Sequence, residues 1–441
     1  MTRFDEISAA IAQRHASSRH SLKEQTSARL SACLAHHWNG ANPTWRVLVE
    51  RHGVRKAQLP RTAEELTRLP LMTRSALRDG NFSERPNAAV FRCVCTSGST
   101  HSAVRVPHSL EMSRATLFDN FLRMFAINGV TDLFPFYGVV HRFDESLSGS
   151  QTTMTFMTDS FREFAAMGDV AEPSEIHWER VRAMAPSTVA SSPGFMMVLA
   201  HHVLRNGQRL AIPRIVVGGA PLSMSGRAVI ERAFAPREIL LFYPTSDAGA
   251  LGCSLNESGD YVSFSETHVI EIVRADGSHV AEGEEGLVAV TALDSLAAPL
   301  IRYLVGDQAT YLGPCTVGER VRLRGIRRVT DALIGDLKIP LADLEEWQNE
   351  LARRGIHIGA LQVAKRPYIG GRAVIVIRVE TAESHAAVEA ATLELVLANR
   401  EIASDIRRQI LTLPRIEVFP PGGLLQGRFK LPVFVDESRL L

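Results

Sequence analysis

The sequence predicts an α/β protein with one large and one small domain, and three observations lead to this fold class. The chain has 441 residues, 45% of them hydrophobic and 22% charged, which is enough to form two substantial cores. Short apolar runs alternate with helical patterns from Phe91 to about residue 312, as in βα units around a parallel sheet. After Asp307 the pattern changes, and a smaller α/β pattern follows.

Roughly the first 85 residues read mainly as helix. Four apolar residues recur at three- and four-residue spacing and so share one helical face: Leu30, Cys33, Leu34 and Trp38. Pro70 and Leu71 mark a turn, after which Thr73 is placed to cap a new helix. We expect this part of the chain to be scaffold rather than a source of catalytic groups.

Strands and helices alternate in the middle of the chain. The pattern predicts strands over residues 188–191, 214–217 and 239–242, separated by helices over 193–206 and 223–235. In such a sheet the ligand-binding loops follow the C-terminal ends of the strands. The three turns with chemically suggestive residues all follow predicted strands, so they can share one cleft.

A compact pattern of roughly 110 residues follows a turn-rich stretch at 311–321 and a basic stretch at 320–328. It predicts strands over 361–364, 373–379 and 415–419, and one helix over 385–411. This pattern is long enough for a small second domain.

Composition excludes several classes of protein. The formal net charge is +1, whereas a broad nucleic-acid-binding surface needs clustered Lys and Arg. The N-terminal stretch is charged, and no later apolar run approaches the length of a membrane span. We therefore expect a soluble, cytoplasmic protein that binds neither nucleic acid nor membrane. Five scattered cysteines without CxxC spacing predict neither a disulfide framework nor a four-thiolate zinc site.

A hydroxyl-rich turn follows the apolar strand that begins this α/β region. Thr96, Ser97, Ser99 and Thr100 each offer a hydroxyl beside a backbone N–H, and Gly98 allows a close backbone approach. Such a turn suits phosphate binding, although it is neither a GxxxxGK[ST] nor a GxGxxG loop. From these residues alone an ordinary polar hairpin loop is an equal alternative.

Together with four later segments, this turn resembles the motifs of the adenylate-forming ligases, most closely their phenylacetate-CoA ligase-like branch. Residues 96–100 resemble the TSGTT phosphate loop, and 217–223 resemble the GGEPLS adenine segment. Residues 242–247 resemble YGxTE, 299–307 resemble PLIRYRTGD, and 328–340 stand in place of GRxDDMIxxxGxxVxP. Five motifs in the family's order, over nearly the whole chain, favour the phosphate-loop interpretation.

The resemblance implies a large N-terminal adenylate-forming domain, residues 1–329, and a small mobile C-terminal domain, residues 330–441. The hinge lies near Thr330, where the family usually carries an aspartate. The implied reaction uses ATP and Mg²⁺ to activate a carboxylic acid as its acyl adenylate. It needs phosphate donors, a Mg²⁺ ligand, a ribose clamp and a cation.

The matching motifs supply a candidate for each part of the nucleotide site. Phosphates would be held by Thr96, Ser97, Gly98, Ser99 and Thr100, and the adenine by Gly219, Ala220 and Pro221. Tyr243 belongs to the same site, Ser246 meets the α-phosphate, Asp307 binds both ribose hydroxyls and Arg328 helps to hold the ribose. Asp247 aligns with the family's Mg²⁺ ligand. An aspartate suits this role because it supplies the hard, charged oxygen that Mg²⁺ requires. The structural alternatives are a helix N-cap or turn for Asp247 and a plain turn for Asp307.

The residues that bind the acid are also assigned by resemblance. Two segments, 134–138 and 192–195, occupy the places of the family's substrate loops. The candidates are Phe136, Tyr137, Gly138, His141, Pro193 and Gly194. Stacked aromatic rings favour a flat, apolar acid, so we expect an aromatic carboxylic acid. An ordinary aromatic core strand is the alternative.

The chain departs from the family pattern near the phosphate loop and near its end. His101 and Ser102 replace Gly-Lys, and Pro244 replaces a glycine, so the local turns must differ. Residues 423–430 resemble PRSxGKxxR, whose first lysine bridges carboxylate and phosphate. Strict alignment places Arg428 there, with Lys430 two residues away, and these two side chains are not equivalent as cations.

Three further expectations follow from the resemblance. Cys253 and His268 stand where some relatives can hold a structural metal, but Tyr261 replaces a histidine, so we expect no such metal. The acyl acceptor is left open between CoA, a carrier-protein thiol, an amine and a downstream reductase, and a homodimer is left open as well. The altered residues also motivate a rival interpretation, a relative that binds nucleotide or aryl acid without turnover.

Overall fold

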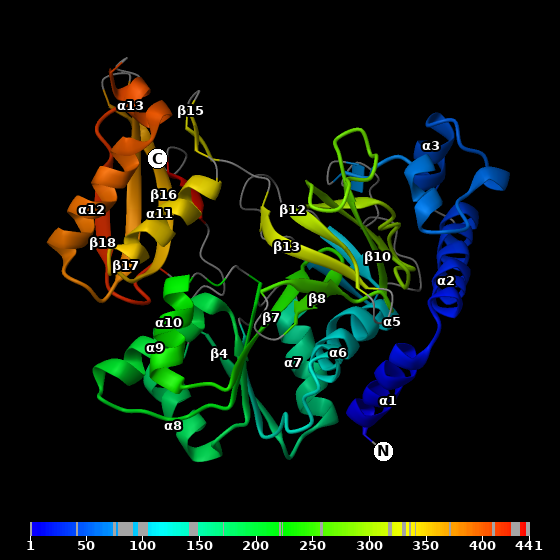
Figure 1. Ribbon diagram of the computed structural model, residues 1–441, viewed down its shortest axis with the longest axis horizontal. Helices are drawn as coiled ribbons and strands as arrows, with labels where there is room; N and C mark the ends of the chain where they lie inside the picture. Colours follow the sequence, from blue (N-terminus) through cyan, green and yellow to red (C-terminus); the bar gives the residue numbers. More distant parts are fainter. Residues whose placement is uncertain are drawn as a thin grey trace. The chain divides into compact units, whose positions relative to one another are not determined.

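The computed structural model describes residues 2–40, 43–73, 76–77, 91–95, 105–140, 149–170, 172–219, 222, 224–255, 259–315, 320–328, 332–334, 337–339, 341–369, 372–407, 411–424 and 433–437. The chain divides into two compact units (Figure 1). The first comprises Met1–Phe136, Arg142–Met167 and Glu238–Arg327. The second comprises Tyr137–His141, Gly168–Arg237 and Arg328–Leu441.

Helices α1 (Arg3–Ala16), α2 (Arg19–Asn39) and α3 (Thr44–Arg51) open the first unit, followed by the 3₁₀ helices η1 (Lys56–Gln58) and η2 (Glu64–Arg68). The side chains of Thr2 and Ser18 accept backbone N–H bonds and so cap α1 and α2. The predicted apolar face of α2 is confirmed, because Leu30, Cys33, Leu34 and Trp38 are all buried. No described helix is long and apolar enough to cross a membrane.

A hairpin and four helical segments follow in the first unit. Strands β1 (Arg92–Cys95) and β2 (Arg105–His108) pair antiparallel. Strand β2 leads into α5 (Leu110–Ser113), the π-helical segment η3 (Arg114–Asp119) and α6 (Asn120–Ile127). Helix α7 (Gly149–Ser160) packs against η3. Turns of π-helix are rare and often lie at functional sites, which draws attention to the neighbours of η3.

Seven strands of the first unit follow one another in the order β10-β11-β12-β13-β9-β8-β7. They are β7 (Glu238–Thr245), β8 (Gly249–Ser254), β9 (Tyr261–Ser263), β10 (His268–Val273), β11 (Glu285–Ala292), β12 (Tyr303–Pro314) and β13 (Val321–Arg328). Strand β8 pairs antiparallel with β7 and β9, and β11 with β10 and β12. The parallel pattern expected up to about residue 312 therefore does not continue beyond β7, and β12 covers part of the stretch read as turn-rich.

The second unit contains the predicted βα elements. The strands run in the order β6-β5-β3-β4, of which β3 and β4 begin with residues of the first unit, and β5 pairs parallel with β6. The elements are β3 (Phe136–Val140), β4 (Ala165–Asp169), α8 (Ser174–Met184), β5 (Thr188–Ser191), α9 (Pro193–Arg205), β6 (Arg214–Gly218) and α10 (Met224–Phe234). The predicted strands and helices between residues 188 and 235 are confirmed to within one residue at each end, partly because Ser192 caps α9 and Pro193 starts it.

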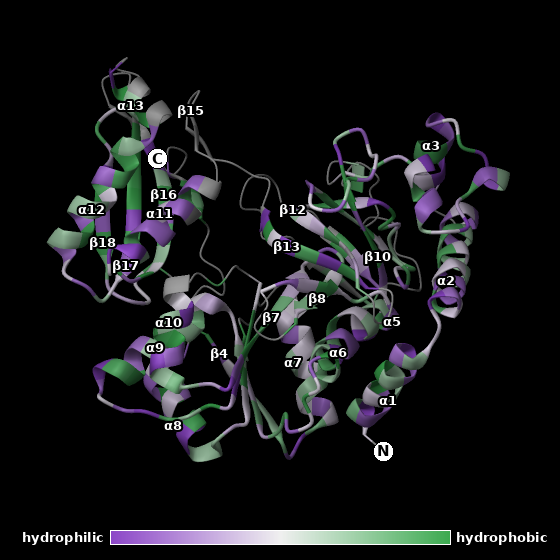
Figure 2. Cartoon of the chain, in the orientation of Figure 1, coloured by the Kyte–Doolittle hydropathy of each residue, from purple (hydrophilic) through white to green (hydrophobic). Residues whose placement is uncertain are grey.

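The C-terminal residues of the second unit form a separate sheet with strand order β18-β17-β16-β19. Its elements are α11 (Leu341–Arg353), β16 (Ile358–Ile369), β17 (Arg372–Thr381), α12 (His385–Ala398), α13 (Arg400–Arg407), β18 (Arg415–Phe419) and β19 (Phe434–Asp436). A small hairpin of β14 (Ala332–Ile334) and β15 (Leu337–Ile339) precedes them. Figure 2 shows the central strands of this sheet mainly in the green of hydrophobic residues.

The single helix expected over 385–411 is two helices in the structure. Helix α12 ends at Ala398, and the side chain of Asn399 accepts the N–H of Ile402 in the first turn of α13. An asparagine that caps the next helix interrupts the first one, because its side chain competes for backbone hydrogen bonds. The hinge at Thr330 and the boundary between residues 329 and 330 lie outside the described residues and stay predictions.

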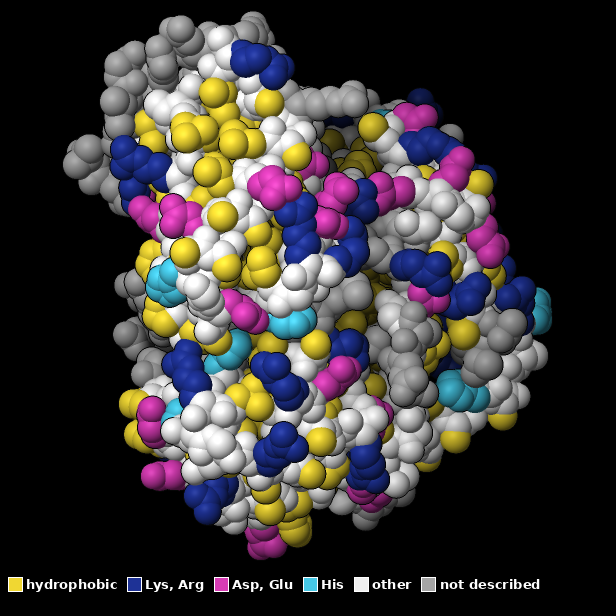
Figure 3. All heavy atoms as spheres, turned by 60° about the vertical axis from the view of Figure 1, so that its left-hand side comes forward, with side chains coloured by type: hydrophobic (Ala, Val, Ile, Leu, Met, Phe, Trp, Pro, Cys, Tyr) yellow, Lys and Arg dark blue, Asp and Glu magenta, His cyan; other side chains and the backbone are white. Residues whose placement is uncertain are grey.

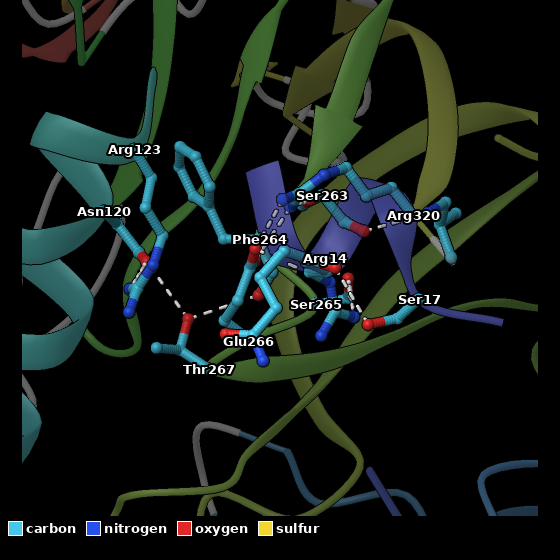
Figure 4. A network of polar contacts seen from close by, with 12 residues as sticks. Arg14, Ser17, Asn120, Arg123, Ser263, Phe264, Ser265, Glu266, Thr267 and Arg320 are labelled. Atoms are coloured by element: carbon cyan, nitrogen blue, oxygen red, sulfur yellow. Dashed lines mark hydrogen bonds and ion pairs between the residues drawn. The ribbon is translucent and has the colours of Figure 1, made fainter. Parts of the chain in front are cut away.

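A partly buried ionic network ties the N-terminal helices to the first unit's sheet (Figure 4). Glu266, in the turn between β9 and β10, forms an ion pair with the buried Arg320 and lies 3.6 Å from Nε of Arg14. Arg29 donates to the carbonyl oxygen of Glu266 and pairs with Asp294 at 2.5 Å. Burial raises the pKa of Glu266, but the arginines outweigh it and hold this pKa at about 2.

Candidate nucleotide site

Two tyrosine–aspartate pairs join the YGxTE-like and PLIRY-like segments inside the first unit. Tyr243, in β7, donates its hydroxyl hydrogen to Oδ2 of Asp307, in β12, at 2.7 Å. Tyr303, at the start of β12, donates to Oδ2 of Asp247, which lies in the turn after β7. Each aspartate follows one tyrosine by four residues and is bonded to the other, so the pairs cross. The structure thus brings together two motifs separated by about sixty residues of chain.

Both candidate carboxylates are buried. Asp247 is 1% exposed and Asp307 is 6% exposed. A buried carboxylate is costly unless it accepts hydrogen bonds, and each tyrosine hydroxyl supplies one. A carboxylate has about four lone-pair positions and can accept several hydrogen bonds at once. The expected roles of Asp307 at the ribose and of Asp247 at a cation stay predictions.

The turn from Thr245 to Gly249 carries Ser246 and Asp247. The Thr245 hydroxyl accepts from the N–H of Ala248 at 3.1 Å and donates to the carbonyl of Gly249 at 3.2 Å. Gly249 has φ +83°, and a Cβ there would lie 2.3 Å from the Thr116 hydroxyl oxygen, so only glycine fits. Strand β8 begins at Gly249, so the helix N-cap alternative for Asp247 does not apply.

Pro244 lies at an irregularity in the pairing of β7 with β8. The pairing of β7 with β8 shifts register between Tyr243 and Pro244. Proline has no backbone N–H to donate to a ladder, so strands that contain it take a bulge or an irregularity. The expectation that this turn differs from one with a glycine at position 244 stays a prediction.

The donor set fits Mg²⁺ only together with a nucleotide. Among the described residues no group of three or more His, Cys, Asp or Glu side chains could hold a metal ion. Mg²⁺ is usually held by one or two carboxylates plus substrate phosphates, so Asp247 fits as the single protein ligand of such an ion. His268 and Cys253, the two residues considered for a structural metal, are both buried. Nε2 of His268 lies 2.9 Å from the carbonyl oxygen of Ala248.

The candidate substrate residues lie in the second unit or at its border. Phe136 is fully buried, with its ring edge-on to Phe121. Tyr137 is 1% exposed and shares a 2.7 Å hydrogen bond with Nδ1 of His177, whose Nε2 donates to the carbonyl of Asp169. Both rings thus lie in a core, the alternative stated for them. Their role in binding an acid stays a prediction.

The remaining predicted residues are partly described. Gly138 lies in β3, and Pro193 and Gly194 form the first turn of α9. Gly219, directly after β6, has φ +84°, so a side chain there would be strained. Thr96, Ser97, Gly98, Ser99, Thr100, His141, Ala220, Pro221, Arg428 and Lys430 lie outside the described residues, as does the side chain of Arg328 at the end of β13.

The surface hollow in the first unit does not coincide with the candidate nucleotide site. A hollow of about 460 Å³ in the first unit contains none of the predicted site residues, and its lining includes Lys23, Ser265, Ile270, Tyr311 and Arg320. On the face drawn in Figure 3, basic and acidic side chains of the described residues are interspersed. This distribution agrees with the formal net charge of +1.

Sequence reasoning missed the contacts of Tyr303, and it missed His108 and Asn120, which hold the turn; it named His268 only at the place of a possible metal. Tyr303 was visible as the tyrosine of the PLIRY segment. Its partner, Asp247, was not visible, because a contact between segments far apart in sequence leaves no local pattern.

No protein-family model matches the chain. One curated relative, indoleacetate–lysine synthetase of Pseudomonas savastanoi, is 23% identical over 184 residues, which cover 41% of this chain and 43% of the relative. The match thus spans less than half of that relative's length. Among solved structures, 2-hydroxyisobutyryl-CoA ligase with a bound acyl adenylate superposes with a TM-score of 0.71 at 18% identity, covering 97% of this chain and 92% of the ligase.

An amide bond synthetase, McbA of Marinactinospora thermotolerans, is similar over 81% of this chain and 69% of its own, with a TM-score of 0.50 at 16% identity. Structural similarity at 16–18% sequence identity establishes the fold of this chain and nothing more. The predicted fold class is confirmed, with a large sheet and a smaller separate one. The chain has the fold of the adenylate-forming ligases.

Proposed function

We propose that the chain activates a carboxylic acid with ATP, forming an acyl adenylate and pyrophosphate. The observation that carries this proposal is the crossed pair of tyrosine–aspartate hydrogen bonds. It joins, in an adenylate-forming fold, the aspartate expected at the ribose with the aspartate expected at the metal. The rival proposal, nucleotide binding without turnover, predicts the same geometry and separates from it only in assays.

The reaction is a displacement at phosphorus. A carboxylate oxygen of the acid forms a bond to the α-phosphorus while the bond from that phosphorus to the bridging oxygen of the β-phosphate breaks. Pyrophosphate leaves with the electron pair. Asp307 holds the nucleoside through its ribose hydroxyls, and Ser246, half-buried in the turn, is assigned to the α-phosphate. Mg²⁺ bound at Asp247 would neutralise phosphate charge.

The acid is proposed to be aromatic, and the acceptor is proposed to be an amine or CoA. The support is the sequence resemblance to aryl-acid ligases and the name of the curated relative, which joins indoleacetate to lysine. A CoA ligase and an amide bond synthetase are both among the similar folds. The domains at 1–329 and 330–441, and a cation from Arg428 or Lys430, are part of the same proposal.

Pyrophosphate exchange into ATP tests the first half-reaction directly. The assay is run with a panel of aryl acids that includes indoleacetate and phenylacetate, and with aliphatic acids as controls. Exchange that depends on an added aryl acid is the expected result. If no acid supports exchange, while calorimetry still detects AMP binding, the non-catalytic rival is correct.

Asp307→Ala supplies the matching binding test. The variant loses two charge-assisted hydrogen bonds to ribose hydroxyls, so we expect AMP binding to weaken by about 2 to 4 kcal/mol. Calorimetry on a folded variant measures this, and unchanged affinity removes Asp307 from the site.

A further inference from the structure

The turn that carries Ser246 and Asp247 has each of four successive carbonyl groups bonded to a side chain. His108 Nε2 donates to the carbonyl of Asp247 at 2.9 Å, and His268 Nε2 donates to that of Ala248 at 2.9 Å. The Thr245 hydroxyl donates to Gly249 at 3.2 Å, and the Asn120 amide donates to Ala250 at 2.8 Å. These side chains come from β2, β10, β7 and α6. A turn held from four elements has little freedom to change its path.

The direction of each hydrogen bond behind His268 follows from its chemistry. A carbonyl can only accept, so His268 Nε2 carries the hydrogen and its Nδ1 is an acceptor. The Thr267 hydroxyl lies 2.8 Å from that Nδ1 and 3.2 Å from the carbonyl of Phe264, and we assign its hydrogen to the shorter contact. The same hydroxyl accepts from the Asn120 amide at 2.8 Å. Burial lowers the pKa of His268 to about 4, which agrees with a neutral ring at neutral pH.

Arg123 completes the series (Figure 4). It donates to Oδ1 of Asn120 at 2.6 Å. Because an arginine never accepts, it orients the Asn120 amide with oxygen toward Arg123 and nitrogen toward the turn. The order of donation therefore runs from Arg123 through Asn120, Thr267 and His268 to the carbonyl of Ala248.

The side chains that hold the turn are as buried as the turn itself. His108 and Asn120 are fully buried, and Thr267 and His268 are 1% exposed. Water cannot readily replace a lost donor at such positions, so removing one takes a hydrogen bond from a buried carbonyl. The backbone of the turn is then expected to shift toward another hydrogen-bond donor, and this shift would displace Ser246 and Asp247.

We propose that His268, His108, Asn120 and Thr267 are positioning residues for Asp247 and Ser246: the first three donate to carbonyls of the turn, and Thr267 orients His268. This inference rests on the proposed function, in which those two residues meet Mg²⁺ and the α-phosphate. Its basis is that a displacement of about 1 Å at a reacting group can cost on the order of 10²-fold in rate. None of the four acts on the nucleotide directly.

The test compares His268 with a second buried histidine that has the same kind of bond elsewhere. His37 Nε2 donates to the carbonyl of Ser295 at 2.6 Å, and burial lowers its pKa to about 4 as well. His268→Leu, His268→Gln and His37→Leu are compared with wild type by acid-dependent pyrophosphate exchange over a range of free Mg²⁺. Hydrogen exchange of the peptide spanning 243–252 and thermal melting are measured on the same samples.

His268→Leu is expected to slow pyrophosphate exchange by about 10 to 10²-fold and to require more Mg²⁺. His268→Gln restores much of this, since an amide can donate to Ala248. Amide hydrogens of the 243–252 peptide exchange faster in His268→Leu only, whereas His37→Leu melts lower without changing the Mg²⁺ dependence. If both leucine variants differ from wild type only in melting, His268 is structural and the inference fails.

Absence of pyrophosphate exchange in wild type is a separate outcome that removes the proposed function. Hydrogen exchange still decides whether His268 holds the turn. Equal protection of the 243–252 peptide in His268→Leu and wild type would overturn that as well.

Discussion

At the scale of single residues, each candidate aspartate already has a protein donor before any ligand is considered. Tyr243 serves Asp307 and Tyr303 serves Asp247. The two phenol groups are chemically alike and lie in the same pair of segments, yet each contacts a different carboxylate. Removing one hydroxyl at a time therefore separates the nucleoside function from the metal function.

Tyr243→Phe is expected to weaken AMP binding about 5-fold, because a net hydrogen bond of about 1 kcal/mol to Asp307 is lost. Tyr303→Phe is expected to raise the Mg²⁺ concentration needed for pyrophosphate exchange while AMP affinity stays within about 2-fold. Calorimetry and a Mg²⁺ titration measure the two effects. If both variants change both quantities equally, the carboxylates do not have separate roles.

Gly249 offers a second test at this scale. Gly249→Ala places a Cβ against Thr116 at a residue with φ +83°, so we expect a loss of about 2 to 4 kcal/mol in the free energy of unfolding. Gly259 has φ +70° and nothing within 4 Å of the added carbon, so Gly259→Ala isolates the backbone strain alone. Urea denaturation compares them, and equal losses would show that contact with Thr116 is unimportant.

At the scale of elements, the network around Glu266 decides how α1 and α2 are held. Four arginines, Arg14, Arg29, Arg123 and Arg320, act on this single turn from different elements. Breaking a buried pair by removing one partner is strongly destabilising, whereas an exposed pair contributes little. The network is thus expected to show in the acid stability of the chain.

The pKa of Glu266 lies at about 2, below its ordinary value of 4.5, so its ion pairs stabilise the fold fully above pH 4.5 and this contribution is lost as the pH falls toward 2. Glu266→Gln should lower stability at pH 7 and flatten its dependence on pH between 4.5 and 2. The control is Asp260→Asn, which removes an ion pair to the exposed Arg324 and should change stability by less than about 1 kcal/mol. Urea denaturation at several pH values measures both, and an acid slope unchanged in Glu266→Gln would contradict the assignment.

Local signals in the sequence predicted the elements between residues 188 and 235 well. A serine N-cap followed by proline is a general start signal for a helix, and Ser192 and Pro193 supply it here. The neighbouring apolar runs are short and end at polar residues or glycine, so their strands could be predicted as well. The antiparallel pairing of the strands after β7 could not be predicted in this way, because it depends on partners far apart in sequence. The break at Asn399 was missed since apolar spacing continues across it.

Motif resemblance predicted that the segments at 242–247 and 299–307 lie together, and it could not predict the hydrogen bonds that hold them. Asp247 and Asp307 were expected at one site, and the structure brings their segments together. Tyr303, His108 and Asn120 were not expected, because their contacts with the turn are made across strands and helices. Phe136 and Tyr137, by contrast, lie in a core, and aromatic composition alone does not distinguish a core strand from a pocket wall.

At the scale of the whole molecule, the C-terminal cation remains the test of catalytic capacity. We expect Arg428→Ala to lower acid-dependent pyrophosphate exchange by about 10²-fold through lost stabilisation of the transition state, and Lys430→Ala to have little effect. Both residues lie outside the described part of the chain. If the two variants keep wild-type rates, the chemistry does not use a cation from this segment.

The crossed bonds between β7 and β12 have a thermodynamic consequence. Because both carboxylates are tied to the same two segments, any displacement of residues 303–307 relative to residues 243–247 would change the proposed ribose contact and the proposed metal contact at once. Occupancy at one carboxylate then biases the strand position seen by the other. Linkage requires the effect to be reciprocal: the factor by which AMP strengthens Mg²⁺ binding must equal the factor by which Mg²⁺ strengthens AMP binding. The two tyrosine–aspartate bonds would thus make the binding of AMP and of Mg²⁺ cooperative, where separate carboxylates would bind them independently.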